Sequence, residues 1–170
     1  MKEIQAISLL CLSMAAVLFD LKEERIPNSI IMTGVLCGGA YQLFLHGMMG
    51  ITIYLGGVLL PILLFGWFYY FRMIGAGDVK LMCAIGGFLG PSSCFSFITI
   101  SVLFAGLISL GIMVRRHNFS QRLMYFAEFV SKYSADKQWL PYIQGVKPEA
   151  RFCFAVPVLG GVLYYIGGMI

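Results

Sequence analysis

Apolar residues gather into six segments along the chain, separated by shorter polar gaps. A helix needs about 20 apolar residues to cross about 30 Å of hydrocarbon. The second, third, fifth and sixth segments are long enough for this, whereas the first and fourth are short. The pattern therefore predicts six transmembrane helices, at approximately Ile4–Phe19, Ile26–Leu45, Ile51–Phe71, Val79–Leu89, Phe95–Val114 and Phe152–Ile170.

The longest polar gap, at about residues 115–151, carries a second pattern. Apolar side chains recur within it at spacings of four and three residues, as on one face of a helix. Such an amphipathic helix would lie in the headgroup plane of the cytoplasmic leaflet, or pack on the cytoplasmic ends of the bundle. The sequence leaves both arrangements open. The apolar positions are Phe119, Leu123, Phe126, Val130 and Tyr133.

The composition requires lipid as the solvent for much of the chain. Of 170 residues, 59% are hydrophobic and 12% are charged, whereas a soluble domain is about a quarter charged. We expect one all-α, polytopic membrane domain over residues 1–170. The start, Met1-Lys2-Glu3, lacks the positive excess of a signal peptide, so the first segment is expected to remain a spanning helix. The five scattered cysteines form no Cys-x-x-Cys pair and are expected to act as small buried apolar residues.

Basic residues are distributed unevenly between the gaps. Of the 12 Lys and Arg residues, only Lys2 falls outside the gaps after the first, third and fifth segments. By the positive-inside rule these three gaps are cytoplasmic, and both termini lie outside. The residues concerned are Lys22, Arg25, Arg72, Lys80, Arg115, Arg116, Arg122, Lys132, Lys137, Lys147 and Arg151.

Two acidic residues directly adjoin apolar segments, and both lie on the predicted cytoplasmic side. Asp20 ends the first segment and Asp78 precedes the fourth. Because the fourth segment is short, its helix is expected to begin at or before Gly75 and to draw Asp78 toward the bilayer edge. An ionisable group in that position is costly and indicates function. Two neighbouring carboxylates do not both ionise easily, so one can act as base and the other as acid.

Ordinary structural explanations exist for several of these residues. Asp78 would serve equally as a helix N-cap, and Asp20 as a solvated loop residue. Lys80 is expected to extend toward the headgroups, although it would also stabilise an ionised aspartate. Gly75 and Gly77 would let a substrate backbone approach without a Cβ in the way. The spaced pairs Gly34/Gly38 and Gly86/Gly90 are interpreted as helix packing.

Two motifs nevertheless resemble one known family. Gly75-Ala-Gly77-Asp78-Val-Lys80-Leu-Met resembles the G-x-G-D-x-K-L signature of the type IV prepilin (leader) peptidases, which are aspartyl peptidases. Asp20, followed by Arg25-Ile-Pro27-Asn28, resembles their other signature, although a Pro-Asn helix start would also explain the last two residues. The motifs stand in the family's order on one predicted membrane face, and the resemblance covers essentially the whole chain.

The resemblance implies a function and a substrate. Such an enzyme removes the short basic leader from type IV prepilins or pilin-like proteins at the cytoplasmic face of the inner membrane, with Asp20 and Asp78 as its catalytic acids. Glu23 and Glu24 would then attract the basic leader, or simply be solvated. The chain lacks the paired cysteines of the long, methylating members, so it resembles the short form. No cofactor, metal or nucleic-acid partner is expected.

Three competing interpretations fit the sequence less well. Presenilin-type proteases share G-x-G-D, but Phe19 precedes Asp20 here and Pro157 lacks their Pro-Ala-Leu context. A small transporter or assembly protein would use Asp20 and Asp78 as a proton relay, with acids nearer mid-membrane. The residues needed for a serine or zinc protease are missing. His46 and His117 are predicted to lie on opposite sides of the membrane, and no H-E-x-x-H motif occurs.

Overall fold

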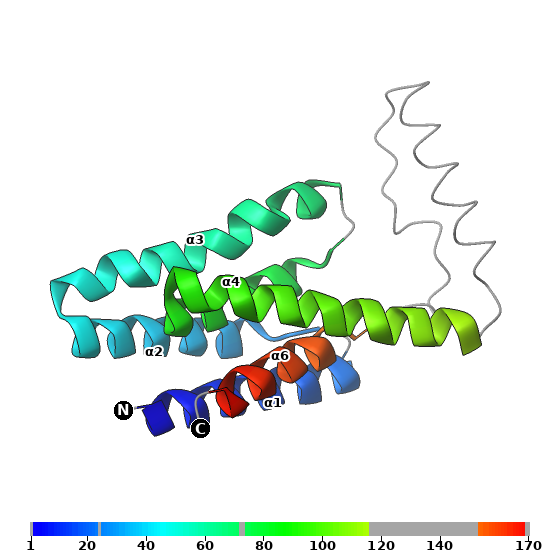
Figure 1. Cartoon of the computed structure of the whole chain (residues 1–170), viewed down its shortest axis with the longest axis horizontal. Coiled ribbons are helices and arrows are strands. Elements are labelled where there is room, and N and C mark those ends of the chain that lie inside the picture. Colours follow the sequence, from blue (N-terminus) through cyan, green and yellow to red (C-terminus); the bar gives the residue numbers. More distant parts are fainter. Residues whose placement is uncertain (1, 24, 72–73, 116–152, 169–170) are drawn as a thin grey trace, which may run out of the picture.

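A computed structural model describes residues 2–23, 25–71, 74–115 and 153–168. Every regular element in these ranges is an α-helix, as predicted (Figure 1). The expected amphipathic segment lies outside the described residues, except for Arg115. The helices are α1 (Lys2–Glu23), α2 (Asn28–His46), α3 (Met48–Tyr70), α4 (Ala76–Arg115) and α6 (Ala155–Gly167).

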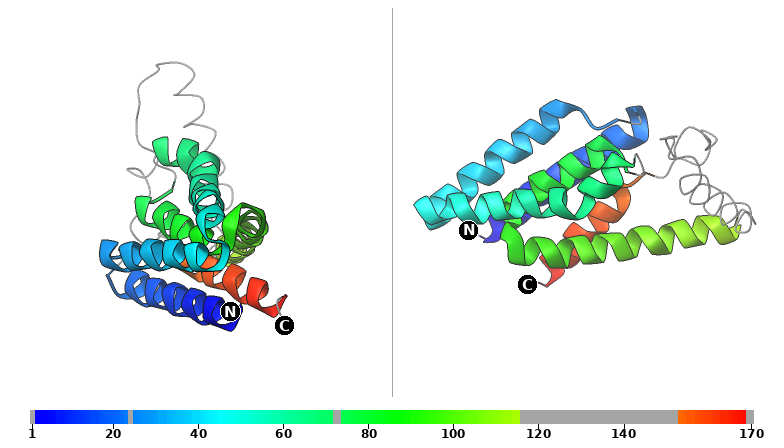
Figure 2. Two further views of the ribbon diagram at one scale, coloured as in Figure 1. Left: turned by 90° about the vertical axis from the view of Figure 1, so that its left-hand side faces the viewer. Right: turned by 90° about the horizontal axis from the view of Figure 1, so that it is seen from above.

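Helix α4 is interrupted at Gly90. This residue has φ 72° and ψ 170°, a conformation that glycine adopts without a Cβ penalty. Pro91 follows it, and a proline disfavours helical geometry in the residue before it. Residues 76–89 and 91–115 run in opposite directions (Figures 1 and 2). The boundary predicted between the fourth and fifth segments is therefore present, but a single residue makes the turn where five were expected.

The first part of α4 forms the centre of the bundle. All residues from Leu81 to Gly90 are buried, which explains a segment that is apolar on every side. Small residues allow the neighbouring helices to approach it closely. A Cβ on Gly57 of α3 would overlap the carbonyl oxygen of Gly86.

All four glycines predicted to pack do so. A Cβ on Gly34 of α2 would lie 2.8 Å from the Leu12 side chain, and one on Gly38 would lie 3.2 Å from the Phe88 ring. Gly86 is in close contact with Gly57, as described above. Gly90 forms the break in α4 and is also closely packed, because a Cβ there would lie 2.7 Å from the Ile53 side chain of α3.

Two buried glutamines stabilise that break. Ending a helix leaves backbone carbonyls without intrahelical partners. The side-chain amides of Gln5 on α1 and Gln42 on α2 both donate to the carbonyl oxygen of Phe88, at 2.9 and 2.8 Å. The Tyr41 hydroxyl in turn donates to the Gln5 side-chain carbonyl at 3.3 Å. These contacts join α1 and α2 to the turn, and no pattern in the sequence predicts them.

Four described helices are long and apolar enough to cross a membrane. Helix α1 has 22 residues, more than the apolar segment Ile4–Phe19, because the helix continues through Asp20 to Glu23. Helix α6 has 13 residues, fewer than predicted for the sixth segment. The six-helix topology with outside termini stays a prediction. The four candidate spans are Glu3–Glu23, Asn28–His46, Met48–Tyr70 and Ala76–Ile112.

The bundle has two distinct ends. The N-terminal end of α1 and the C-terminal end of α6 lie at one end, with the α2–α3 connection and the turn inside α4 (Figure 1). The C-terminal ends of α1 and α3 lie at the other end, with the starts of α2, α4 and α6. Both sequence motifs belong to this second end.

Candidate active site

Asp20 and Asp78 lie at helix ends on the same end of the bundle. Asp20 is in the last turn of α1, and Asp78 is the third residue of α4. Both are half-buried. The charge of Asp20 acts on the Asp78 carboxyl, so the two groups lie within electrostatic range of each other. Like charges at this range make it unfavourable for both groups to be ionised together.

Asp78 is not the N-cap residue that the sequence also allowed. Helix α4 begins at Ala76, one residue later than expected, so Asp78 stands inside its first turn. Its carboxylate accepts a hydrogen bond from the backbone N–H of Gly75. This contact is half of a capping box, in which an acid at the third helical position reaches back to the capping residue. The aspartate is therefore held at the start of the buried central helix.

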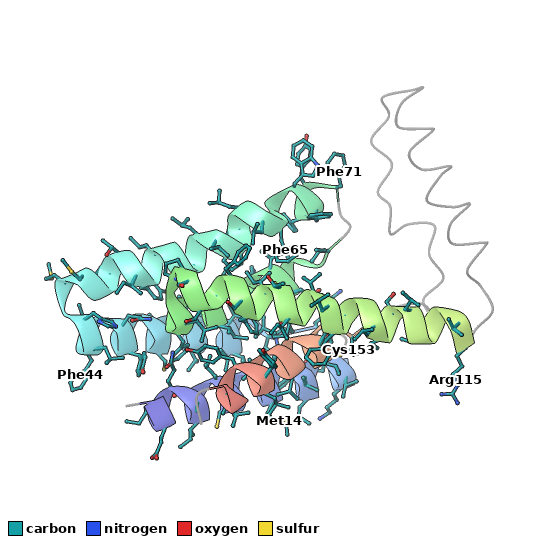
Figure 3. The ribbon with its side chains drawn as sticks, viewed as in Figure 1. Met14, Phe44, Phe65, Phe71, Arg115 and Cys153 are labelled. Atoms are coloured by element: carbon teal, nitrogen blue, oxygen red, sulfur yellow. The ribbon has the colours of Figure 1, made fainter. Side chains whose placement is uncertain are left out.

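Asp20 is held by a thiol that precedes α6. The Cys153 Sγ donates a hydrogen bond to Asp20 Oδ2 at 2.8 Å. The same sulfur accepts hydrogen bonds from the backbone N–H groups of Ala155 and Val156, in the first turn of α6. Figure 3 shows Cys153 where the chain enters α6, beside α1. One sulfur atom thus connects α6 to the acid on α1.

The Cys153 thiol is a persistent donor. Burial, then the hydrogen bond to Asp20, then the charge of Asp20 raise the pKa of the Cys153 thiol to about 12. The two N–H contacts from α6 act in the opposite direction but are outweighed. The sulfur therefore keeps its proton at neutral pH and cannot serve as a nucleophile there, because the reactive form of a cysteine is the thiolate.

The two motifs contact each other directly. Lys80 Nζ donates to Asn28 Oδ1 at 3.1 Å, so the ammonium is bound to α2 rather than extended alone toward headgroups as expected. Pro27 is the residue immediately before α2, in agreement with a Pro-Asn helix start. A Cβ on Gly77 would lie 3.7 Å from the Ile26 side chain, so the loop before α2 packs on the start of α4.

The remaining predicted site residues are Gly75, Arg25, Glu23 and Glu24. A Cβ on Gly75 would lie 3.0 Å from Asp78 Oδ2, so a side chain there would crowd the carboxylate. Arg25 is exposed in the bend between α1 and α2, and Glu23 is exposed at the end of α1. Glu24 lies outside the described residues. Among the residues described, no group of three His, Cys, Asp or Glu side chains is arranged to hold a metal ion.

Residues 7–110 match the profile of the type IV leader peptidase family. The chain belongs to this family. The matched region contains Asp20, Asp78 and every other residue of the two motifs, and it covers more than half of the sequence. A leader peptidase of this kind is a protease, and its apolar helices fit a multi-pass membrane protein. No curated protein and no solved structure matches the chain significantly.

Cys153 is the site residue that sequence reasoning missed. It was expected to act as a small buried apolar side chain, but its thiol is half-buried and hydrogen-bonded to Asp20. The two residues are 133 positions apart, and Cys153 lies beyond the region that matches the family. Neither a motif nor a local spacing connects them, so the contact emerges only from the packing of α6 on α1.

Proposed function

We propose that the chain is an aspartyl leader peptidase in which Asp20 and Asp78 form the catalytic pair. The observation that carries the proposal is the electrostatic proximity of these two half-buried carboxylates, which are supplied by different helices. The ionised member takes a proton from the attacking water. The protonated member donates a proton to the scissile amide as the carbon–nitrogen bond breaks.

The proposed substrate is a type IV prepilin or pilin-like protein. In such a substrate a short basic leader is followed by a hydrophobic helix, and the bond to be cut lies between them. A pair of acids at the ends of membrane-spanning helices suits a bond at the boundary between water and lipid. The basic residues near the same end of the bundle, including Arg25 and Lys80, support a cytoplasmic orientation in the inner membrane.

Glu23 gives the site a local negative charge for the leader. It is exposed at the end of α1, one helical turn from Asp20. Glu24 follows it in the sequence. A basic leader would be attracted toward these carboxylates before it reaches the catalytic pair.

The alternative of a proton relay in a transporter is less well supported. A relay across the membrane needs ionisable groups near its middle, whereas Asp20 and Asp78 stand in the last and first turns of their helices. A relay also gives no reason for Asn28 to bind Lys80 beside the acids.

Co-expression with candidate prepilins tests the proposal. The wild-type chain, Asp20→Asn and Asp78→Asn are compared by the mobility and N-terminal sequence of the pilin product. Each asparagine variant should lose at least about a hundredfold in processing rate, because the proton transfers in question contribute about that much. Glu3→Gln, at the opposite end of α1, is the matched control. Wild-type processing by either aspartate variant would show that the pair is not catalytic.

A further inference from the structure

Cys153 joins the start of α6 to the candidate catalytic acid on α1. Its sulfur accepts two backbone N–H groups of the first turn of α6 and donates its own proton to Asp20 Oδ2. The first N–H groups of a helix carry its partial positive charge. The thiol therefore fixes one carboxylate oxygen of Asp20 and presents a polarised proton to it.

We propose that Cys153 is a positioning residue that holds Asp20 as the general base, with Asp78 as the general acid. The inference rests on the aspartyl peptidase function proposed above and deepens it. A hydrogen bond donated to a carboxylate favours its charged state. Because the two acids interact electrostatically, negative charge on Asp20 favours the protonated form of Asp78.

The groups facing Asp20 are consistent with this assignment. The titratable groups that the structure records against it are Cys153 before α6 and Asp78 on α4. Lys80, the nearest motif cation on α4, is bound to Asn28 of α2. The thiol is thus the donor that distinguishes Asp20 from Asp78, whose recorded donor is a backbone N–H.

The first test compares Cys153→Ala with Cys153→Ser in prepilin cleavage by the purified full-length chain. Serine keeps a donor and is a favourable residue at a helix start, so Cys153→Ser should retain near wild-type kcat. Cys153→Ala should lose roughly tenfold in kcat, the order expected for one charged hydrogen bond, with KM little changed. In the pH–rate profile of Cys153→Ala, the acid limb should also move to higher pH by about one unit. The reason is that a carboxylate without its hydrogen-bond donor holds a proton more tightly.

A purely structural role gives a different pattern. Cys37→Ala, which removes an exposed thiol on α2, is the matched control and should keep the wild-type profile. The unfolding midpoint in detergent is measured for each variant. If Cys153→Ala and Cys153→Ser lose activity equally without a shift of the acid limb, or if Cys153→Ala is fully active, the proposal is wrong.

A second measurement does not need peptidase activity. Iodoacetamide alkylation of Cys153 is followed by mass spectrometry of its peptide, in the wild type and in Asp20→Asn. Removing the neighbouring charge lowers the pKa of the thiol. Alkylation at fixed pH should therefore accelerate about three- to fourfold for each pKa unit lost, because the gain in thiolate is partly offset by its lower nucleophilicity. Alkylation of Cys37 in the same chain should not change. An unchanged Cys153 rate would overturn the pairing with Asp20.

The two measurements separate the two hypotheses. If no prepilin is cleaved by the wild type, while Asp20→Asn accelerates alkylation of Cys153, the proposed substrate fails but the thiol–carboxylate pair stands. If prepilin is cleaved and neither the alkylation rate nor the pH profile responds, the peptidase proposal survives. The positioning role of Cys153 is then refuted.

Discussion

Lys80 and Asn28 join the two sequence motifs through one hydrogen bond, with 3.1 Å between Nζ and Oδ1. Lys80 follows Asp78 on the central helix, and Asn28 is the first residue of α2. The residues are 52 positions apart. The contact fixes the start of α4 against the start of α2, and so bears on where Asp78 stands relative to Asp20.

Breaking this hydrogen bond should reduce activity without unfolding the chain. Both side chains are exposed, and exposed pairs contribute about 0–1 kcal/mol to stability. We expect Lys80→Met and Asn28→Ala each to lower kcat/KM for prepilin roughly fivefold, through less accurate placement of Asp78. The double variant should be no worse than either single variant, which a double-mutant cycle of kcat/KM measures.

Arg115→Met provides the control for loss of a cation. Arg115 is exposed at the far end of α4, where its side chain points away from the bundle (Figure 3). The Arg115→Met variant should retain the wild-type kcat/KM for prepilin. If Lys80→Met and Asn28→Ala multiply their effects in the double variant, the two residues act independently and the hydrogen bond does not position the site.

The sequence predicted that Asp20 and Asp78 lie at the same end of the bundle, but not the contacts that hold them there. Apolar periodicity, charge asymmetry and two motifs predict that Asp20 and Asp78 lie at one end of a helical bundle. This follows because successive helices run in opposite directions, so every second connection lies at the same end. The Cys153–Asp20 contact depends on how α6 packs on α1, and no local pattern encodes that. Helix α1 is also longer than its apolar segment, because its last turn consists largely of charged residues, which apolar periodicity does not include.

Glu23 should affect substrate binding more than the chemical step. It is exposed at the end of α1, so its charge acts on a basic leader through water and is partly screened by salt. We expect Glu23→Lys to raise KM roughly threefold with kcat unchanged, and the effect to shrink as ionic strength rises. Glu3→Lys, at the other end of the same helix, should leave KM unchanged. A KM unaffected by Glu23→Lys would remove Glu23 from the leader-binding surface.

The paired glutamines at the turn in α4 should contribute to stability rather than catalysis. Gln5 and Gln42 both donate to the Phe88 carbonyl, at the end of the bundle opposite Asp20 and Asp78. Hydrogen bonds between membrane helices contribute about 1 kcal/mol each. We expect Gln42→Leu to lower the free energy of unfolding in detergent by about 1 kcal/mol, and Gln5→Leu to do the same.

Loss of both glutamines should cost more than the sum of the two single changes. The first substitution leaves the Phe88 carbonyl with one donor, whereas the second leaves a buried carbonyl with none from these side chains, which costs about 1–3 kcal/mol. The catalytic constants of the folded fraction should stay at the wild-type level. Strict additivity would mean that the two amides stabilise the turn separately.

Two glycines on α3 provide a matched test of the close approach to the central helix. A Cβ on Gly57 would overlap the Gly86 carbonyl, whereas one on Gly66 would have no atom within 4 Å. Gly57→Ala should therefore destabilise the bundle by about 2 kcal/mol, because α3 and α4 must move apart. Gly66→Ala should be neutral, or stabilising by up to about 1 kcal/mol through helix propensity. Thermal unfolding in one detergent compares them directly. Because residues 76–89 include Asp78, Gly57→Ala should reduce prepilin cleavage, whereas Gly66→Ala should preserve it. Equal stability of the two variants would mean that the packing of α3 does not depend on this contact.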